Sequence, residues 1–201
     1  MKSLYKFIIS PLNERYDNTI KVEGIDLITN TTIEDHKSVS KKAVVIETPS
    51  AFKSKIKKGD HVIVHHNIFR RYYDMKGREK NSGSYFNEDK YFCTNDQIYL
   101  IKKENTYETN LNYCFVKPLL NTNKLSLNKE LPLRGVVKYS NKYLSEKNII
   151  ENTLISFNPN SEFEFILDGE KLYCMKSNNI VLTHEHEGNE KENNPSWAKS
   201  C

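Results

Sequence analysis

Short runs of β-branched and aromatic residues recur along the chain between clusters of turn-forming residues. Apolar residues rarely follow the three-and-four spacing of an amphipathic helix. The pattern predicts an all-β fold with strands at residues 5–10, 43–48, 61–66, 91–94, 98–103, 113–117, 135–140, 153–157, 163–167, 172–175 and 179–185.

The predicted strands form two series whose short motifs match in the same order. The matches pair residues 9–12 with 116–119, 42–45 with 134–137, 60–64 with 152–156, and 91–100 with 173–182. Each match is weak alone and chance is the alternative, but the preserved order favours a duplicated domain. We expect domains at 1–105 and 110–187, a polar linker near 104–112, and a disordered tail at 188–201.

Each half is expected to close into a small β-barrel, because a few short strands cannot hide their edges as an open sheet. Pro11 and Pro118 fall where a strand ends, so their missing N–H groups leave the sheet intact. Gly59 is expected to take a positive φ in a tight turn that leads into the buried run HVIVH.

Composition adds few constraints. The 201 residues carry a net charge of +4 that is spread along the chain, which gives no strong footprint for nucleic acid or membrane. The apolar run near the N-terminus is interrupted by Pro11, and no segment reaches membrane-spanning length, so we expect a cytoplasmic protein. The 4 cysteines are far apart and form no CxxC, which favours reduced thiols over a zinc or redox site.

Three motifs together resemble one known family. ISPLNERY (9–16), IKKGDHVIVHH (56–66) and YFCTNDQIYLIKK (91–103) are similar, in order and spacing, to segments of the bacterial-type co-chaperonins, the GroES-like lids of the chaperonin ring. The resemblance covers nearly all of residues 5–103 and, more faintly, 113–185. It implies two tandem GroES-like β-barrels.

The segment VEGIDLITN (22–30) falls where this family carries its mobile loop, here about 17–41. The resemblance implies that the loop docks in an apolar groove on the apical domains of a chaperonin ring through Gly24, Ile25, Asp26, Leu27 and Ile28. Asp26 departs from the valine that is usual in the family. The alternative for this aliphatic run is an ordinary strand buried in the barrel.

The resemblance also implies the activity. The chain would cap an ATP-bound chaperonin ring as a homo-oligomer and assist protein folding, with no enzymatic activity and no cofactor of its own, because the partner binds the ATP. Short-roofed, divergent lids of this kind resemble those of tailed phages, whose client is capsid protein and whose site of action is the host cytoplasm. A chloroplast-type tandem lid is the other precedent. How many chains form the ring stays open.

The sequence departs from the family in three places. Residues 48–59 leave room only for a shortened roof, and residues 68–90 form an insertion with no role in the family. In the second half, residues 120–133 replace the mobile loop, and Leu125 and Leu127 could imitate its anchor, although a plain surface connection is favoured.

Two further groups of residues suggest other functions. Residues 70–78 mix basic and aromatic side chains, as single-strand nucleic-acid surfaces do, so a small β-barrel nucleic-acid-binding module is the alternative function. Acidic neighbours such as Glu79 dilute the charge and favour a solvated loop. HEHE (184–187) has the composition of a metal site but lacks a defined third ligand, and no catalytic motif is present, so neither metal binding nor catalysis is expected.

Overall fold

The structure is a computed structural model that describes residues 2–16, 19–22, 25–28, 30, 32–104, 106–123, 129–186 and 190–200. The fold is all-β, as predicted, with one short α-helix and four 3₁₀ turns in the described part of the chain. All of the predicted strands are present, with small shifts of their ends. The chain divides into two compact units, Met1–Tyr107 and Glu108–Cys201.

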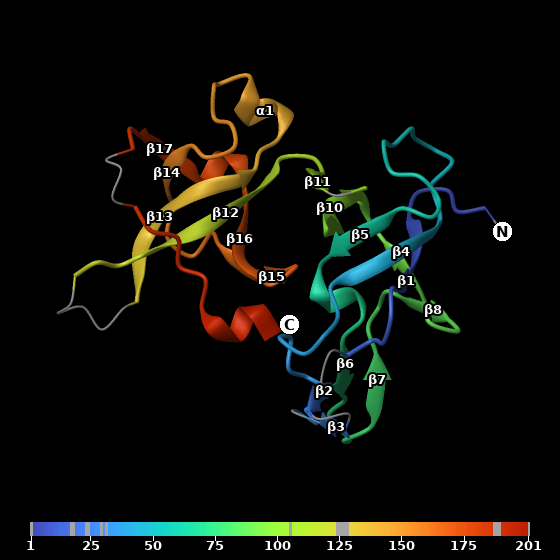
Figure 1. Ribbon diagram of the computed structural model, residues 1–201. Helices are drawn as coiled ribbons and strands as arrows, with labels where there is room; N and C mark the ends of the chain where they lie inside the picture. Colours follow the sequence, from blue (N-terminus) through green and yellow to red (C-terminus); the bar gives the residue numbers. More distant parts are fainter. Residues whose placement is uncertain are drawn as a thin grey trace. The chain divides into compact units, whose positions relative to one another are not determined.

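The first unit is built on a seven-stranded antiparallel sheet with the order β11-β10-β5-β4-β1-β9-β8 (Figure 1). Its strands are β1 (Phe7–Pro11), β4 (Lys42–Glu47), β5 (His61–Val64), β8 (Tyr85–Asn87), β9 (Lys90–Cys93), β10 (Ile98–Lys103) and β11 (Thr106–Thr109). Short 3₁₀ turns, η1 (His66–Ile68) and η2 (Asn95–Gln97), follow β5 and β9. The segment 104–112, expected to be a polar linker, therefore contains strand β11.

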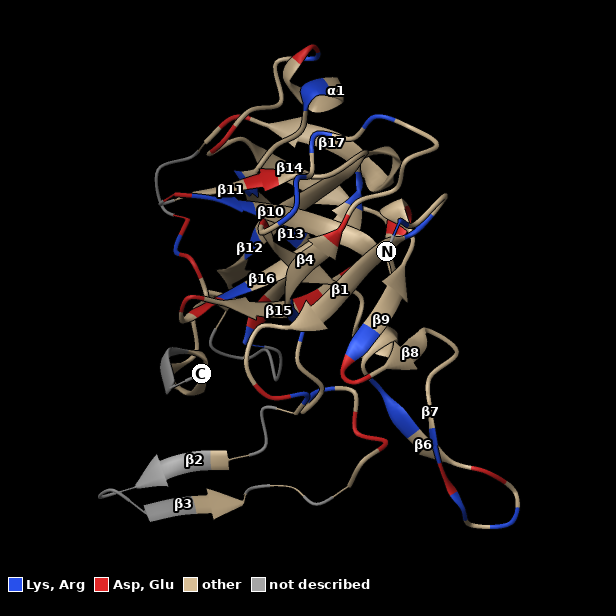
Figure 2. Cartoon of the chain, turned by 90° about the vertical axis from the view of Figure 1, so that its right-hand side faces the viewer, with Lys and Arg blue, Asp and Glu red and all other residues tan. Residues whose placement is uncertain are grey.

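Two hairpins in the first unit lie outside this sheet (Figures 1 and 2). Strands β2 (Thr19–Val22) and β3 (Ile25–Ile28) pair only with each other, and so do β6 (Arg71–Tyr73) and β7 (Glu79–Asn81). The first hairpin is inserted between β1 and β4, and the second between η1 and β8. Segment 17–41, expected to be a flexible loop, thus contains a paired β-hairpin.

The second unit is built on a six-stranded antiparallel sheet with the order β15-β16-β12-β13-β14-β17. Its strands are β12 (Tyr113–Leu120), β13 (Glu130–Tyr139), β14 (Leu154–Phe157), β15 (Phe163–Leu167), β16 (Glu170–Lys176) and β17 (Ile180–His184). The remaining elements are helix α1 (Lys142–Ser145) and the 3₁₀ turns η3 (Ser177–Asn179) and η4 (Ser196–Ser200).

The two units repeat one strand order. The order β8-β9-β1-β4-β5-β10 in the first unit matches β15-β16-β12-β13-β14-β17 in the second, and in the described residues β11 is the one strand of the two sheets without a counterpart. Strands β1 and β12 share a register shift at the same place. The corresponding pairs are Ile9 with Val45 and Pro11 with Ala43 in the first unit, and Val116 with Val137 and Pro118 with Gly135 in the second. The duplicated order expected from the sequence motifs is therefore present in the strand pairing.

One of the four sequence matches is displaced by one residue. In the first unit Lys57 N–H donates to Asp60 Oδ2 at 2.9 Å, and in the second Ile150 N–H donates to Thr153 Oγ1 at 3.1 Å. Asp60 therefore corresponds to Thr153, not to Asn152. Asn152 instead occupies the position of Gly59, and both have positive φ, 66° and 87°.

Neither sheet closes into a barrel through the strand pairing of the described residues: β8 and β11 are the edges of one, β15 and β17 of the other. Closed barrels were expected because open edges must be protected. Other elements cover the sheets instead. Ile68 and Phe69 of the insertion after β5 join the core of the first unit, and Leu144 of α1 joins that of the second.

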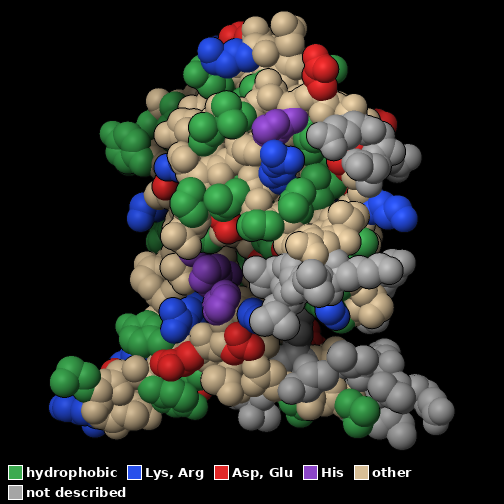
Figure 3. All heavy atoms as spheres, turned by 90° about the vertical axis from the view of Figure 1, so that its left-hand side faces the viewer, with side chains coloured by type: hydrophobic (Ala, Val, Ile, Leu, Met, Phe, Trp, Pro, Cys, Tyr) green, Lys and Arg blue, Asp and Glu red, His purple; other side chains and the backbone are tan. Residues whose placement is uncertain are grey.

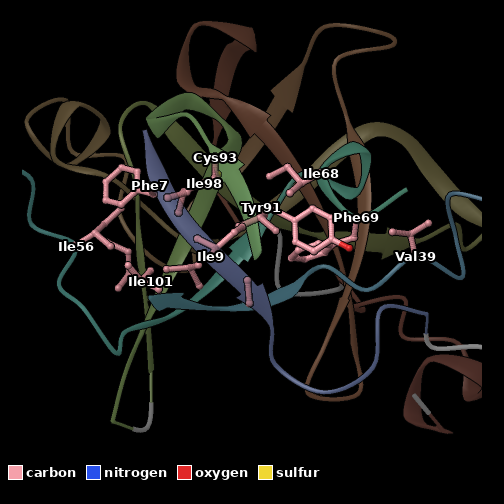
Figure 4. Packing of buried hydrophobic residues seen from close by; sticks show 14 of the residues in the cluster. Phe7, Ile9, Val39, Ile56, Ile68, Phe69, Tyr91, Cys93, Ile98 and Ile101 are labelled. Carbon is pink, nitrogen blue, oxygen red and sulfur yellow. The ribbon is translucent and has the colours of Figure 1, made fainter. Parts of the chain in front are cut away.

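The core of the first unit gathers on one face of its sheet (Figure 4). Tyr91 is its largest fully buried side chain and meets Phe69 edge-on, with ring centroids 4.9 Å apart. The positions that point inward in the second unit match those of the first, because Cys114, Val116 and Val137 occupy the places of Phe7, Ile9 and Val45. Burying apolar surface in this way is the main source of stability in each unit.

The described residues of the tail, 190–200, are packed rather than disordered. Leu120 N–H donates to the Lys191 carbonyl at 2.7 Å, Asn193 N–H donates to the Pro118 carbonyl at 2.8 Å, and Ala198 is fully buried. The segment is polar, so its composition predicted disorder. It is ordered because it pairs with the end of β12, where backbone groups supply partners that composition does not reveal.

A candidate docking hairpin in the first unit

The aliphatic run that the sequence singled out lies in hairpin β2–β3. Leu27 pairs with Ile20 and Ile28 with Thr19. The side chains of Leu27 and Ile28 are 50% and 66% exposed. For these two residues the alternative of a strand buried in a barrel is wrong.

The other predicted docking residues are placed only in part. Ile25 and Asp26 belong to β3, opposite Val22 and Lys21. Gly24 lies outside the described residues, as do Leu125 and Leu127 of the second unit. The assignment of Gly24, Ile25, Asp26, Leu27 and Ile28 to chaperonin binding stays a prediction.

The base of the hairpin insertion is held by the core of the first unit. Tyr16 and Val39, on its two sides, form an isolated β-bridge, and both are buried in the core cluster. Ser40 N–H donates to the Arg15 carbonyl at 3.1 Å, and the Tyr16 hydroxyl donates to the Ile33 carbonyl at 2.7 Å. The insertion therefore begins and ends at one fixed place on the unit.

Asp35 organises the return from β3 to the core. Its carboxylate accepts hydrogen bonds from the Lys37 N–H at 3.0 Å, the Ser38 hydroxyl at 3.1 Å and the Asn30 amide at 2.6 Å. These donors, the Lys37 N–H first, lower the pKa of Asp35. This turn was not predicted from the sequence, although Asn and Asp residues such as Asn30 and Asp35 favour side-chain-to-backbone turns.

Three histidines meet beside this return segment. The ring of His66 lies 4.4 Å from that of His65 and 5.4 Å from that of His36, measured between centroids. Burial, together with the nearby His65, His36, Lys41 and Arg70, lowers the pKa of His66 to about 4. On the face drawn in Figure 3, histidine side chains lie next to basic ones at the surface, without labels that assign them to particular residues.

The basic-aromatic segment 70–78 forms strand β6 and the turn after it. Arg71 is engaged within the unit, since its guanidinium lies 2.7 Å from Glu79 Oε1 and 5.0 Å from the centre of the Tyr16 ring. Tyr72 and Tyr73 are consecutive in a strand, so their side chains point to opposite faces. The arrangement offers no continuous row of stacking rings for a single strand.

The histidines near the end of β17 have partners within the second unit. His184 Nε2 lies 2.8 Å from Ser156 Oγ, and His186 Nε2 lies 2.6 Å from the Asn152 carbonyl oxygen. They line a pocket of about 640 Å³ together with Arg134, Leu119 and Leu154. Among the described residues, no group of three or more His, Cys, Asp or Glu side chains is arranged to hold a metal ion.

No protein-family model matches this sequence, and comparison with curated proteins finds no match. In the described residues, no helix has the length and apolar character needed to cross a bilayer. The fold and the exposed Leu27 and Ile28 of the β2–β3 hairpin are therefore the basis of the function proposed below.

Proposed function

We propose that the chain is a tandem co-chaperonin, which caps an ATP-bound chaperonin ring and assists protein folding. The first unit supplies the docking hairpin, and the second is a diverged copy that completes the architecture. The six strands that the two units share form a divergent, open version of the GroES-like barrel that the sequence resemblance implies, and the chains form a ring. The chain itself performs no catalysis and binds no cofactor. In a phage-encoded form it acts in the host cytoplasm, where capsid protein is the client.

The observation that carries the proposal is the exposure of Leu27 and Ile28 on a hairpin outside the main sheet. Leu27 and Ile28 are consecutive in β3, so their side chains point to opposite faces of the hairpin, and each gains free energy when a partner covers it. The insertion lies between β1 and β4, where the resembling family carries its docking loop. In the second unit the matching connection between β12 and β13 is only residues 121–129.

The energetics fit a lid that must be released. Full burial of an aliphatic side chain stabilises a complex by roughly 1.5–3 kcal/mol, and ordering a backbone residue opposes it by roughly 1–2 kcal/mol. One hairpin therefore binds weakly. Several hairpins on one ring bind strongly together because each raises the effective concentration of the others.

The test is capture of a purified bacterial chaperonin ring by the full-length chain, with ATP, with ADP and without nucleotide. We expect capture that requires nucleotide, and its loss in Leu27→Ser/Ile28→Ser. The matched control is Val181→Ser/Leu182→Ser in β17, where both aliphatic side chains are just over half exposed. This control should bind like the wild-type chain.

Absence of capture under every nucleotide condition would overturn the proposal. Capture that survives Leu27→Ser/Ile28→Ser would remove the docking role from the hairpin. Thermal unfolding of each variant checks that the units remain folded.

A further inference from the structure

The β6–β7 hairpin has no counterpart in the second unit, where β14 runs through residues 158–162 directly to β15. It projects from the same end of the first unit as the docking hairpin in both ribbon views (Figures 1 and 2). None of the described residues of the hairpin belongs to the core cluster of the first unit, whereas Ile68 and Phe69, just before it, do.

The hydroxyl of Tyr16 connects the two hairpins. It donates to the Ile33 carbonyl at 2.7 Å, on the return side of the docking insertion, and accepts from the Arg71 N–H at 2.8 Å, in β6. A second link runs from the Tyr73 N–H to Glu34 Oε1 at 3.1 Å. Tyr16 is buried, so the two hydrogen bonds of its hydroxyl are partly shielded from water, whereas the bond to Glu34 is exposed.

Arg15 holds the base of the β6–β7 hairpin from both sides. Its Nη1 donates to Asn81 Oδ1 at 2.7 Å, at the end of β7, and its Nη2 donates to the Arg70 carbonyl at 3.3 Å, before β6. Its Nε also donates to the Phe69 carbonyl. Because Arg15 and Tyr16 are adjacent, one dipeptide contacts both the base of the β6–β7 hairpin and the return segment of the docking insertion.

The tip of the β6–β7 hairpin is a well-formed turn that presents an apolar side chain. Asp74 Oδ1 accepts hydrogen bonds from the Lys76 and Arg78 N–H groups at 2.9 Å each, and Gly77 takes a φ of +71°. Met75 at the apex is fully exposed, and Tyr73 is about half exposed. Methionine adapts to irregular apolar surfaces and tyrosine adds area at low entropy cost, so both suit a binding surface.

We infer that the β6–β7 hairpin is a second docking arm, which lays Met75 and Tyr73 on the same chaperonin ring that receives Leu27 and Ile28. The inference rests on the proposed function. A ring that covers the tip of one hairpin lies within reach of the other, because both hairpins project from the same end of the first unit and Tyr16 links the β6–β7 hairpin to the return segment of the docking insertion. Two weak apolar contacts with a preset separation bind more tightly than either alone.

The test measures the affinity of the full-length chain for a purified bacterial chaperonin ring with nucleotide. Tyr73→Ser/Met75→Ser should weaken binding about tenfold, the effect of losing about one buried apolar side chain. Tyr16→Phe keeps the ring beneath Arg71 but removes the connecting hydroxyl, and should weaken binding severalfold. The matched control, Tyr143→Ser/Ile150→Ser, removes two comparably exposed side chains of the second unit and should bind like the wild type.

The outcomes separate the two proposals. If Leu27→Ser/Ile28→Ser abolishes capture while Tyr73→Ser/Met75→Ser leaves the affinity unchanged, the second arm is overturned and the lid function stands. If the wild-type chain captures no chaperonin, both are overturned. Binding of single-stranded DNA that disappears in Tyr73→Ser/Met75→Ser would assign the hairpin to nucleic acid and overturn the second arm as well.

Discussion

Lys171 Nζ lies 2.6 Å from Glu130 Oε1 in the second unit, with the lysine side chain only 9% exposed. Burial by itself would raise the pKa of Glu130, but hydrogen bonds from Lys171, Tyr173 and Asn193 outweigh it and lower that pKa. Asn193 belongs to the tail, and its amide donates to Glu130 at 2.9 Å. This ion pair therefore joins β13 and β16 to the tail.

Glu130→Gln should destabilise the second unit, because it leaves the amine of Lys171 largely buried with only Glu164, at 3.0 Å, as its anionic partner. We expect a loss of about 1–3 kcal/mol in the free energy of unfolding, measured by urea denaturation. The control is Glu88→Gln, which removes an exposed ion pair to Lys90 and should change stability by less than about 0.5 kcal/mol. Equal effects of the two changes would contradict this account of the tail.

Acid should loosen the place where the docking insertion returns to the core. The pKa of His66 is lowered to about 4 by burial and by the neighbouring His65, His36, Lys41 and Arg70. Among the described groups that shift the pKa values of His65 and His66, Asp96 is the one anion. It faces His65 and opposes the lowering of that residue's pKa. The unfolded chain takes up the proton near pH 6.5. The contribution of neutral His66 to the free energy of unfolding is therefore complete above about pH 6.5 and is lost as the pH falls toward 4.

The measurement is the free energy of unfolding at several pH values between 7.5 and 4.5. His66→Gln cannot take up the proton, so its stability should fall less over this range than that of the wild type. His61→Gln removes an exposed histidine of β5 and should follow the wild-type curve. A His66→Gln curve parallel to the wild-type curve would show that this histidine does not cause the acid response.

The pattern of apolar residues predicted every strand of the second sheet and five of the seven strands of the first, together with their repetition, but it did not predict β8 or β11. The apolar pattern could not give the exact alignment of β14 with its counterpart β5. Similar apolar residues coincide whether Asp60 is matched to Asn152 or to Thr153. The two alignments differ in which side chain caps the turn, and both the hydrogen bonds to Asp60 and Thr153 and the pairing of β4–β5 and β13–β14 distinguish them. A shift of one residue reverses the face of every side chain in a strand.

The hairpins outside the main sheets were missed for a different reason. Strands β6 and β7 are three residues each, and β7 reads Glu-Lys-Asn, so neither shows an apolar face. The connection through Tyr16 joins residues 17 and 55 positions apart, which no local pattern reveals. Long-range hydrogen bonds of this kind follow from tertiary structure, whereas the apolar anchor at Leu27 was visible because it stands in a polar segment.

Gly135 marks a close approach between β13 and β12. A Cβ at this position would lie 2.4 Å from Val116 Cγ1 and 2.6 Å from the Lys117 carbonyl oxygen. Gly135→Ala should therefore destabilise the second unit by about 1–3 kcal/mol, measured by thermal or urea unfolding. Gly83→Ala is the control, because a Cβ there meets nothing within 4 Å. A stability loss at Gly135 no larger than that at Gly83 would contradict the close packing of these strands.

Gly59 and Asn152 occupy the same position in the two units, and this equivalence predicts which substitutions each tolerates. Both have positive φ, and a Cβ at Gly59 meets nothing within 4 Å, so only the backbone conformation limits the choice. Asparagine adopts this left-handed conformation more readily than alanine. Gly59→Ala should lower the free energy of unfolding by about 1–2 kcal/mol, and Gly59→Asn by less. The converse change, Asn152→Gly, should be nearly neutral, whereas Asn152→Ala should be destabilising. If alanine and asparagine were equally costly at residue 59 in urea unfolding, the one-residue correction to the repeat would lose its support.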